Sequence, residues 1–465
     1  MHDEKNKQQR AKKGLFKTIS KMVPAVGTAL IATALGFVAL YTSPVPMIQD
    51  FGKMLTIGII VSFILGIFLL IPLLFSRDSF FTIDHVNKQG NEKKKRKKPS
   101  RLLSRLTDTI ISLRWVIIVV AFTAAAIGIW LDVDAGVETD VETFMPQDTQ
   151  ALKDIHKLRD IVGTTDQISI VYEGEDMTSY KTITWLDDVT GAIEEEFPDV
   201  VVETKSLSSM LRLMNDHKLP NEEDVDDFMA DIPEEQLKMF MNEEGKKGVI
   251  TVGMKHLETE RLQDFITDLD QFLQRESLDR MTTSITGKAV LDVEMIEGLS
   301  SGRYQMTLLG MGLVFLGLLV IYRHPVKAFI PLLPIILIVG WSGLAMYFLE
   351  MDYTPLTATL GALIIGIGTE FTVLIMERYF EEREKGRGAN VAIRVANQKI
   401  GQAIVVSALT TIGGFCALLA SDFVILNNFG LMTLINITFA LFSTIVVMPA
   451  ILILFDRFVK IKHTS

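Results

Sequence analysis

Glu370 is the residue whose type and position point most directly to chemistry. It lies in Leu356–Met376, a stretch that carries no other charge and is long enough to cross a bilayer. A carboxylate at that depth costs about 2.5–3.5 kcal/mol on membrane-insertion scales, so it requires a partner, a proton or a role. The sequence therefore predicts a proton- or ion-handling group inside a helical membrane protein.

Small and polar residues surround this carboxylate in the sequence or recur in later apolar stretches. The candidate hydrogen-bonding neighbours of a proton relay are Thr369, Thr372, Thr410, Thr411 and Asn436. Close helix packing is predicted at the glycines Gly361, Gly366, Gly368, Gly413 and Gly414. Two interpretations stay open: proton handling linked to transport, or a permanently protonated Glu370 that only makes helix packing more specific.

The elements that must position these residues are membrane spans. Apolar windows of about 20 residues predict a polytopic α-helical membrane protein with eight spans. They fall at residues 22–43, 53–75, 112–131, 304–322, 328–349, 355–376, 400–420 and 428–455.

Charge divides the chain in a way that fits this topology. Residues 133–303 hold 39 acidic and 16 basic residues, a net charge of −23, whereas the remainder has 17 acidic and 30 basic residues. The basic segments flank spans, so we expect no nucleic-acid partner, cytoplasmic N- and C-termini and an extracytoplasmic 133–303 block. The run Lys93–Lys98 is either a topology signal or a site for anionic lipid.

Residues 133–303 read as an α+β domain built from two βαβ units. Strands are predicted near 167–172, 200–203, 249–254 and 282–285, with amphipathic helices at 180–197 and 261–275. The acidic middle of the domain is predicted to be helical. Its apolar residues either pack a small core or form an adaptable ligand surface: Met229, Met239, Phe240 and Met241.

The first two spans repeat in the last two at a constant offset of 378 residues. Gly36-Phe37 matches Gly414-Phe415, and Phe51-Gly52 matches Phe429-Gly430. Both pairs run in the same direction through the membrane, which is typical of parallel transporter repeats. The second copy has six spans around the 133–303 domain, whereas only the last two spans of the first copy are present.

The predicted organisation follows from these observations. Residues 1–80 hold the N-terminus and the end of an incomplete first repeat, and residues 81–109 form a basic linker. The second repeat consists of its first span at 110–132, the acidic α+β domain at 133–303 and a five-span bundle at 304–465. We expect neither an enzyme nor a cofactor, because no nucleophile–base pair or metal-ligand cluster stands out. The single cysteine, Cys416, permits no disulfide within the chain.

Four motifs carry a resemblance to a known family. They are Gly366–Phe371, Glu377-Arg378-Tyr379, the run Ser407–Phe415 and the short segment Glu142–Pro146. Together they resemble the RND superfamily, and most closely the MMPL-like hydrophobe and amphiphile exporters common in archaea. The chain is similar to the C-terminal two-thirds of such a transporter. It departs from the usual motif because Glu370-Phe371 stands where the family often has Asp-Tyr.

The resemblance implies proton-gradient-driven export of hydrophobic or amphiphilic compounds or lipids across the cell membrane. It also implies membrane lipids as partners, and either a homo-oligomer or a separately encoded N-terminal half. The alternatives are a non-transporting lipid or sterol sensor, an assembly protein of the same fold, or an inactive fragment.

Overall fold

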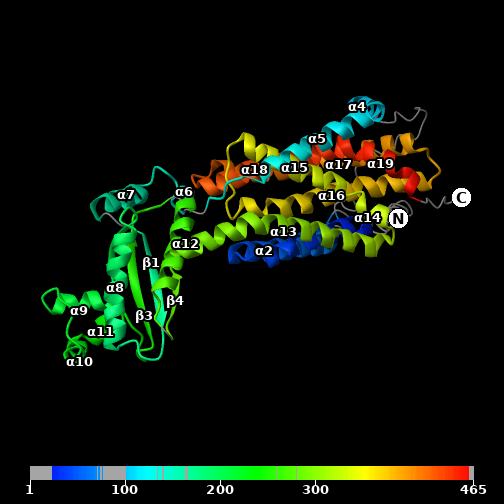
Figure 1. The fold of residues 1–465 in the computed structure, drawn as a ribbon. Coiled ribbons are helices and arrows are strands. Elements are labelled where there is room, and N and C mark those ends of the chain that lie inside the picture. The colour runs from blue at the N-terminus through cyan, green and yellow to red at the C-terminus, as the bar shows by residue number, and fades with distance from the viewer. Residues whose placement is uncertain are drawn as a thin grey trace, which may run out of the picture. The chain divides into compact units, whose positions relative to one another are not determined.

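The computed structural model describes residues 23–459 apart from 71, 74–75, 77–100, 134, 139–140, 163–165, 258 and 279. The predicted basic run Lys93–Lys98 and the basic N-terminus lie outside the described residues. The chain forms two compact units, one of residues 1–137 with 298–465 and the other of residues 138–297. Figure 1 shows the helices of the first unit and the sheet of the second.

The first unit is a bundle of long apolar helices. Its helices after the first span are α2 (Pro46–Leu65), α4 (Arg101–Ser112), α5 (Arg114–Asp132), α13 (Lys288–Tyr322), α14 (Pro325–Phe329), α15 (Leu332–Phe348), α16 (Leu360–Glu384), α17 (Ala389–Phe415), α18 (Val424–Phe442) and α19 (Met448–Phe455). Helix α13 begins within the second unit and continues into this one.

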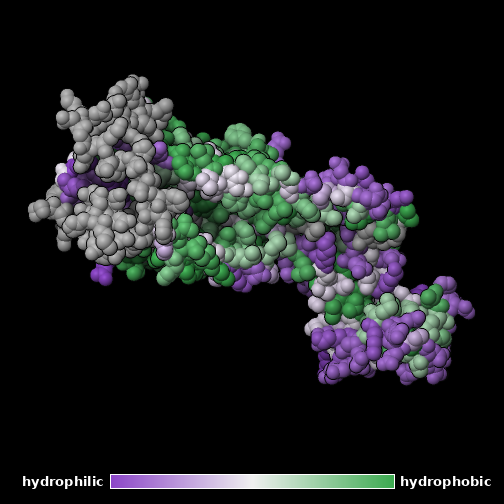
Figure 2. All heavy atoms as spheres, turned by 180° about the vertical axis from the view of Figure 1, so that it is seen from behind, coloured by the Kyte–Doolittle hydropathy of each residue, from purple (hydrophilic) through white to green (hydrophobic). Residues whose placement is uncertain are grey.

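Eight helical segments among the described residues are long and apolar enough to cross a membrane, which confirms the eight predicted spans. They are Val23–Thr42, Pro46–Leu69, Arg114–Asp132, Gly302–Tyr322, Pro325–Phe348, Thr357–Glu384, Ala389–Ala420 and Val424–Phe458. Figure 2 shows apolar side chains over the surface of this unit, and large ones such as Val320 (76% exposed) and Phe68 (75% exposed) lie on it. Exposing so much apolar surface to water is unfavourable, whereas the lipid chains of a membrane would cover it.

Small residues let two of these helices approach closely. A Cβ atom at Gly128 of α5 would lie 1.8 Å from the carbonyl oxygen of Gly340 in α15, and one at Gly340 would lie 2.4 Å from the carbonyl oxygen of Ala125. The indole N–H of Trp341 in α15 also donates to the carbonyl oxygen of Ala121 at 3.1 Å. Backbone contact between α5 and α15 therefore requires glycine at these positions.

The second unit is a four-stranded sheet with helices packed on it. Its elements are α6 (Val141–Phe144), α7 (Gln150–Val162), β1 (Asp166–Glu173), α8 (Tyr180–Glu196), β2 (Val201–Lys205), α9 (Leu207–Met214), α10 (Val225–Asp231), α11 (Glu234–Leu237), β3 (Lys247–Met254), α12 (Thr259–Glu276) and β4 (Thr282–Thr286). The strand order is β2-β3-β1-β4, and each neighbouring pair is antiparallel.

This order makes the second unit a split βαβ fold. The predicted β1-α8-β2 and β3-α12-β4 units are both present, but a strand of the other unit lies between the two strands of each. One core joins the sheet to both helices through Ile168, Ile170, Leu186, Leu269 and others. Of the four predicted apolar side chains of the acidic segment, Met239 is 71% exposed and the others pack against this core: Met229, Phe240 and Met241.

The internal repeat appears as matching helix irregularities. The first span ends in a 3₁₀ turn at Ala39–Thr42, and α17 is followed by one at Cys416–Ala420. Helices α2 and α18 begin at Pro46 and Val424, which are 378 positions apart, and both pass into a π turn, at Gly66–Leu70 and Ser443–Val447, which are 377 positions apart. Such irregularities are uncommon in helices, so their agreement to within one residue supports a true duplication.

Packing contacts repeat as well. A Cβ atom at Gly52 would lie 2.6 Å from Leu40 Cβ, and one at Gly430 would lie 2.7 Å from Leu418 Cβ. The equivalent rings of Phe51 and Phe429 also meet each other edge-on, with centroids 6.0 Å apart. Equivalent residues of two copies touch only near the axis that relates them, so the pseudo-two-fold axis passes close to this pair.

Candidate functional site

Glu370 lies in the middle of α16, the most buried of the eight spans (Figure 1). Its side chain is half-buried, and both chain neighbours, Thr369 and Phe371, are buried. No described residue forms a hydrogen bond or ion pair with its carboxylate. Glu370 is therefore an acid in an apolar helix, and no described residue pairs with it. Its charged form is costly there, and binding a proton removes that cost.

The face of α16 that bears Glu370 packs against the first span. Thr33 donates its hydroxyl to the carbonyl oxygen of Gly366 at 2.9 Å, and a Cβ atom at Gly366 would lie 2.9 Å from the Phe37 ring. Glu370 follows Gly366 by four residues, so it lies one turn further along the same face. Ala29, one turn before Thr33 in the first span, is also buried. The face of α16 that bears Glu370 therefore lies where the two repeats meet.

The other predicted relay residues do not reach Glu370 by a hydrogen bond. Thr369 and Thr372 donate to carbonyl oxygens of their own helix, at Ile365 and Gly368. The hydroxyls of α17 do the same: Thr410 donates to Val406 and Thr411 to Ser407. Asn436 is buried in α18, and neither polar atom of its amide has a partner among the described residues.

The predicted packing glycines fall into two groups. Those of α16 make close contacts, because a Cβ atom at Gly361 would lie 2.3 Å from Thr307 Oγ1 and one at Gly368 would lie 3.1 Å from Ile335 Cγ1. Those of α17 do not, because a Cβ atom at Gly413 or Gly414 would meet no described neighbour within 4 Å.

A buried ionic cluster lies at the end of the bundle where α16 begins. Asp132 is the last residue of α5, and its carboxylate accepts hydrogen bonds from Tyr353 at 2.7 Å, from Tyr304 at 2.5 Å and from Arg303 at 3.3 Å. The Arg303 guanidinium lies 3.8 Å from the centroid of the Tyr353 ring. Side chains of Arg303 and Asp132 are only 6% and 10% exposed, so this pair is shielded from solvent.

This Asp132 cluster joins three chain segments. Asp132 is the last residue of α5, Arg303 lies in α13, and Tyr353 precedes α16. The chain enters residues 138–297 shortly after Asp132 and leaves them shortly before Arg303, so the cluster links both connections to the segment that precedes α16. The amide of Tyr353 also donates to the carbonyl oxygen of Gly136 at 2.8 Å. Burial and the Asp132 carboxylate raise the pKa of Tyr353 above its ordinary value, so its hydroxyl stays protonated and donates.

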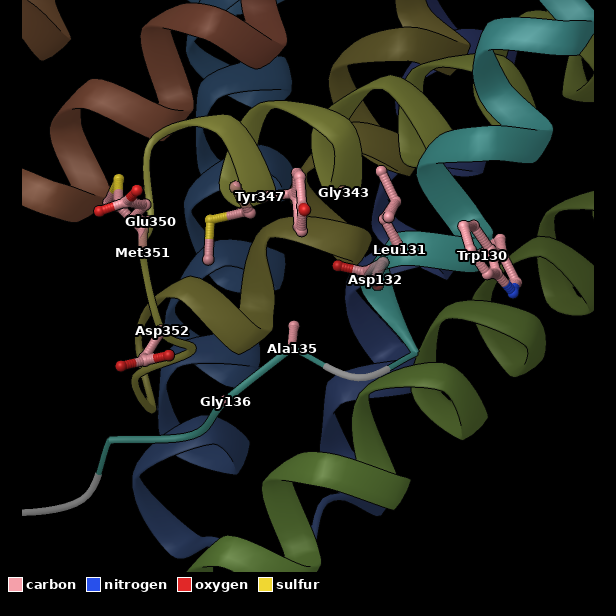
Figure 3. Close-up of a pocket in the computed structure, with 11 residues that line it drawn as sticks. Trp130, Leu131, Asp132, Ala135, Gly136, Gly343, Tyr347, Glu350, Met351 and Asp352 are labelled. Carbon is pink, nitrogen blue, oxygen red and sulfur yellow. The ribbon is translucent and has the colours of Figure 1, made fainter.

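A pocket of about 290 Å³ opens beside the Asp132 cluster (Figure 3). Trp130, Met346 and Tyr347 give it apolar walls, while Glu350 and Asp352 add carboxylates from the loop between α15 and α16. A few polar groups set in a largely apolar wall are typical of sites for amphiphilic molecules.

Two further ionic clusters lie at the opposite end of α16. Asp456 accepts hydrogen bonds from Tyr379 at 2.5 Å and from both Nε and a terminal nitrogen of Arg383 at 2.8 Å. Glu382 is 1% exposed and pairs with Arg387 at 2.7 Å and Lys385 at 3.1 Å, as well as with Arg378. Helix α16 is thus held by charged side chains at both ends, with Glu370 between them.

These clusters were not predicted from the sequence. Asp132 and Arg303 are 171 residues apart, and charged residues are ordinary at the ends of spans, so nothing in the sequence pairs them. The only available signal was that Tyr353 lies in a short polar connection between two long apolar stretches.

The bundle, its internal repeat and the inserted split βαβ unit define a polytopic α-helical membrane protein of the RND type. The chain belongs to the MMPL family, whose profile matches residues 143–465.

Relatives and solved structures agree with this assignment. A putative membrane protein of Methanocaldococcus jannaschii is 26% identical over 69% of this chain and 85% of its own length. The sulfolipid-1 exporter MmpL8 of Mycobacterium tuberculosis is 25% identical over 38% of this chain and 17% of its own length. The hedgehog release protein Disp of the water bear Hypsibius dujardini superposes with a TM-score of 0.64 at 12% identity, over 94% of this chain and 59% of that one.

A translocon-associated membrane protein, SecDF of a Thermus species, has a TM-score of 0.52 at 13% identity, over 97% of this chain and 52% of that one. The chain therefore spans only about half the length of these two solved proteins, and it matches a smaller share of the length of the exporter.

Proposed function

We propose that this chain is the C-terminal part of an exporter that uses a proton gradient to move hydrophobic or amphiphilic compounds or lipids across the cell membrane. The observation that carries the proposal is Glu370, an acid without a described partner in a buried span at the contact between repeats. Family membership and the named exporter among the relatives support it. The basic segments that flank the spans support cytoplasmic termini and an extracytoplasmic position of residues 133–303.

The proposed mechanism begins with a proton on Glu370. Protonation removes a charge from the α16 face that contacts the first span, and this changes how favourably the two helices pack. Tyr353 lies in the short connection that leads into α16, so movement of α16 pulls on the Asp132 cluster, which holds the end of α5 and the middle of α13. Both chain connections to the 138–297 unit would then move together. The pocket beside the cluster, lined by residues of the helical unit, offers a place for the substrate.

The proposal is tested by measuring transport in vesicles prepared from the membranes of cells that produce the protein. A fluorescent phospholipid analogue serves as the probe, and a pH gradient is imposed across the vesicles. Glu370→Gln keeps the size of the side chain but cannot ionise, so we expect gradient-driven transport to be lost while the protein level is unchanged. Glu370→Asp, which keeps the carboxylate, should retain part of the transport. Transport by Glu370→Gln at the wild-type rate would contradict the proposal.

A lipid-sensing role without transport is the second candidate. It is favoured by the lack of a hydrogen-bonded relay from Glu370 to Thr369, Thr372 or Asn436. A sensor would bind the same lipid probe whether or not a pH gradient is present, and Glu370→Gln would leave that binding unchanged.

A further inference from the structure

Two hydroxyls in the last span, Val424–Phe458, depart from the bonding pattern of the other hydroxyls in that span. Thr433 and Thr438 donate to carbonyl oxygens four residues earlier, at 2.7 and 2.8 Å. Ser443 and Thr444 are both 0% exposed, but neither hydroxyl has a hydrogen-bond partner among the described residues. A buried polar atom without a partner is costly in the interior of a membrane protein. These two hydroxyls therefore call for a ligand.

Both hydroxyls lie at the start of the π turn Ser443–Val447. The π turn that follows α2 in the first repeat begins with Gly66 and Ile67. A π turn thus forms in this fold without hydroxyls at its start, so the turn itself does not explain why Ser443 and Thr444 are polar. Single π turns inside α-helices frequently occur at functional sites.

A third buried oxygen lies beside this turn. Asn397 of α17 is 0% exposed, and its amide nitrogen donates to Thr107 Oγ1 of α4 at 3.1 Å and to the carbonyl oxygen of Ile445 at 3.4 Å. The amide oxygen of Asn397 has no partner in the described part of the chain. Because Ile445 directly follows Ser443 and Thr444, three oxygens without a described partner lie near one another where α4, α17 and the last span meet.

Pro449 interrupts the helix at the same place. It has no backbone N–H, so the carbonyl oxygen of Ile445, four residues earlier, loses the donor that a regular helix supplies. Asn397 donates to this oxygen instead, at 3.4 Å, which is longer than an ordinary hydrogen bond. Helices bend where a proline or a π turn interrupts the ladder of hydrogen bonds and where water inserts into it.

A buried amide in α18 indicates which ligand fits this part of the bundle. Asn436 is 4% exposed and lies seven residues before Ser443, on the same side of the helix. Neither its amide nitrogen nor its amide oxygen has a partner among the described residues. A cation would satisfy only the oxygens and an anion only the N–H and O–H groups, whereas water both donates and accepts. Water is therefore the ligand that fits all of these side chains.

We propose that the π turn Ser443–Val447 is a water-binding hinge in the last span. Water held by Asn397, Ser443 and Thr444 supplies the hydrogen bonds that these side chains lack. The same water takes over carbonyl oxygens that are freed when the turn changes its hydrogen-bond pattern, so the helix bends there at low cost.

Such a hinge gives the last span a part in the movement of α16. Asp456 lies beyond the π turn and accepts hydrogen bonds from Tyr379 at 2.5 Å and from Arg383 at 2.8 Å, both of which belong to α16. Bending at the π turn lets α19 and Asp456 follow this end of α16 while α18 stays in place. This part rests on the proposed function, whereas the binding of water does not.

Radiolytic footprinting of the full chain in lipid nanodiscs tests the binding of water. X-rays generate hydroxyl radicals from bound water as well as from bulk water, so a buried methionine is oxidised rapidly only where water lies beside it. Met448 is 0% exposed and directly follows the π turn. We expect rapid oxidation of Met448 in the wild-type protein and its loss when Ser443→Ala and Thr444→Val are combined.

Thr433→Val is the matched control. Thr433 is also 0% exposed, but its hydroxyl already donates to the carbonyl oxygen of Phe429, so this substitution should leave the oxidation of Met448 unchanged. Glu370→Gln should leave it unchanged as well. Failure of proton-driven export and failure of water binding therefore give different results.

Thermal unfolding of the single variant Thr444→Val gives a second measurement, and its sign is decisive. Valine has the shape of threonine without the hydroxyl. With water bound, Thr444→Val removes one partner of the water and should lower the melting temperature. A hydroxyl without any partner is better replaced by valine, so a higher melting temperature would overturn the proposal.

Hydrogen–deuterium exchange tests the hinge. We expect the backbone amides of Ser443–Val447 to exchange faster than those of Met432–Ala440, and the double substitution to slow them. Equal exchange along the whole span would overturn the hinge. Oxidation of Met448 at the same rate in the wild type and the double variant would overturn the binding of water, and so would oxidation that requires Na⁺ or K⁺ in the buffer, because a cation would then occupy the site.

Discussion

Two carboxylates of the helical unit differ in whether neighbouring side chains balance their charge. Asp132 receives hydrogen bonds from an arginine and two tyrosines, so its charge is balanced and its geometry is fixed. Glu370 receives none from the described residues. A balanced charge suits a structural clamp, whereas an unbalanced one favours proton uptake and release. We therefore propose that Asp132 holds α16 in place and that Glu370 binds and releases the proton.

Breaking the Asp132 cluster should be strongly destabilising. Asp132→Asn leaves the Arg303 guanidinium buried without its counter-ion, which typically costs about 3–5 kcal/mol. Thermal unfolding of the purified protein in detergent measures the loss. Lys53→Met, which removes an exposed pair with Asp50, is the control and should change stability by less than about 1 kcal/mol. Equal effects of the two substitutions would show that the Asp132 cluster is not a clamp.

At the scale of helices, glycine determines how closely α5 and α15 approach. We expect Gly128→Ala to lower the melting temperature sharply, because the added methyl group would meet the Gly340 carbonyl at 1.8 Å and force the helices apart. Gly312→Ala in α13 is the control, since its Cβ position has no described neighbour within 4 Å, and alanine there should be neutral or stabilising by up to about 1 kcal/mol. Similar melting temperatures for both variants would contradict the close packing.

Most helices and strands could be predicted from sequence because each follows a local pattern. Apolar windows mark the spans, and alternation in β1 marks a strand with Ile168, Ile170 and Tyr172 on its buried face. The span predicted at residues 355–376 is part of a longer helix, because the apolar window closes where the charged residues begin. The helix continues to Glu384, where pairs such as Arg378 with Glu382 support its last turns.

The candidate site was only partly predictable for a related reason. Glu370 stands out because one local rule, the cost of a charge in an apolar span, applies to it alone. The Asp132 cluster depends on contacts between residues far apart in sequence, and a single sequence does not show which chain segments meet. The exposure of Gly413 and Gly414 in α17 could not be predicted either, because glycines in an apolar span are expected to be packing residues.

At the scale of the whole molecule, the 138–297 unit has its own core and should fold when produced alone. Tyr172 lies in that core with 0% exposure, and burial raises its pKa above the ordinary value. Both the folded and unfolded states keep the phenol proton below about pH 10, and above it only the unfolded state loses the proton. Stability should therefore fall by about 1.4 kcal/mol for each pH unit above about 10.

Urea unfolding of the isolated unit at about pH 9 and about pH 11 measures this loss. In Tyr172→Phe the difference between the two conditions should shrink by the same amount, because the phenol is gone. The Tyr172 hydroxyl has no hydrogen-bond partner among the described residues, so this substitution should not destabilise the unit at about pH 9. An unchanged difference between the two conditions would show that Tyr172 is not the titrating group.

Proton-driven export requires that Glu370 binds and releases a proton within the pH range in which the cell works. Infrared difference spectroscopy of the protein in lipid bilayers, titrated between about pH 5 and about pH 9, detects this directly through the carbonyl band of a protonated carboxyl group. We predict a band that disappears as the pH rises and is missing from the Glu370→Gln spectrum. A Glu370 band that persists unchanged across the whole titration would mean a permanently protonated side chain, and would contradict proton-driven export.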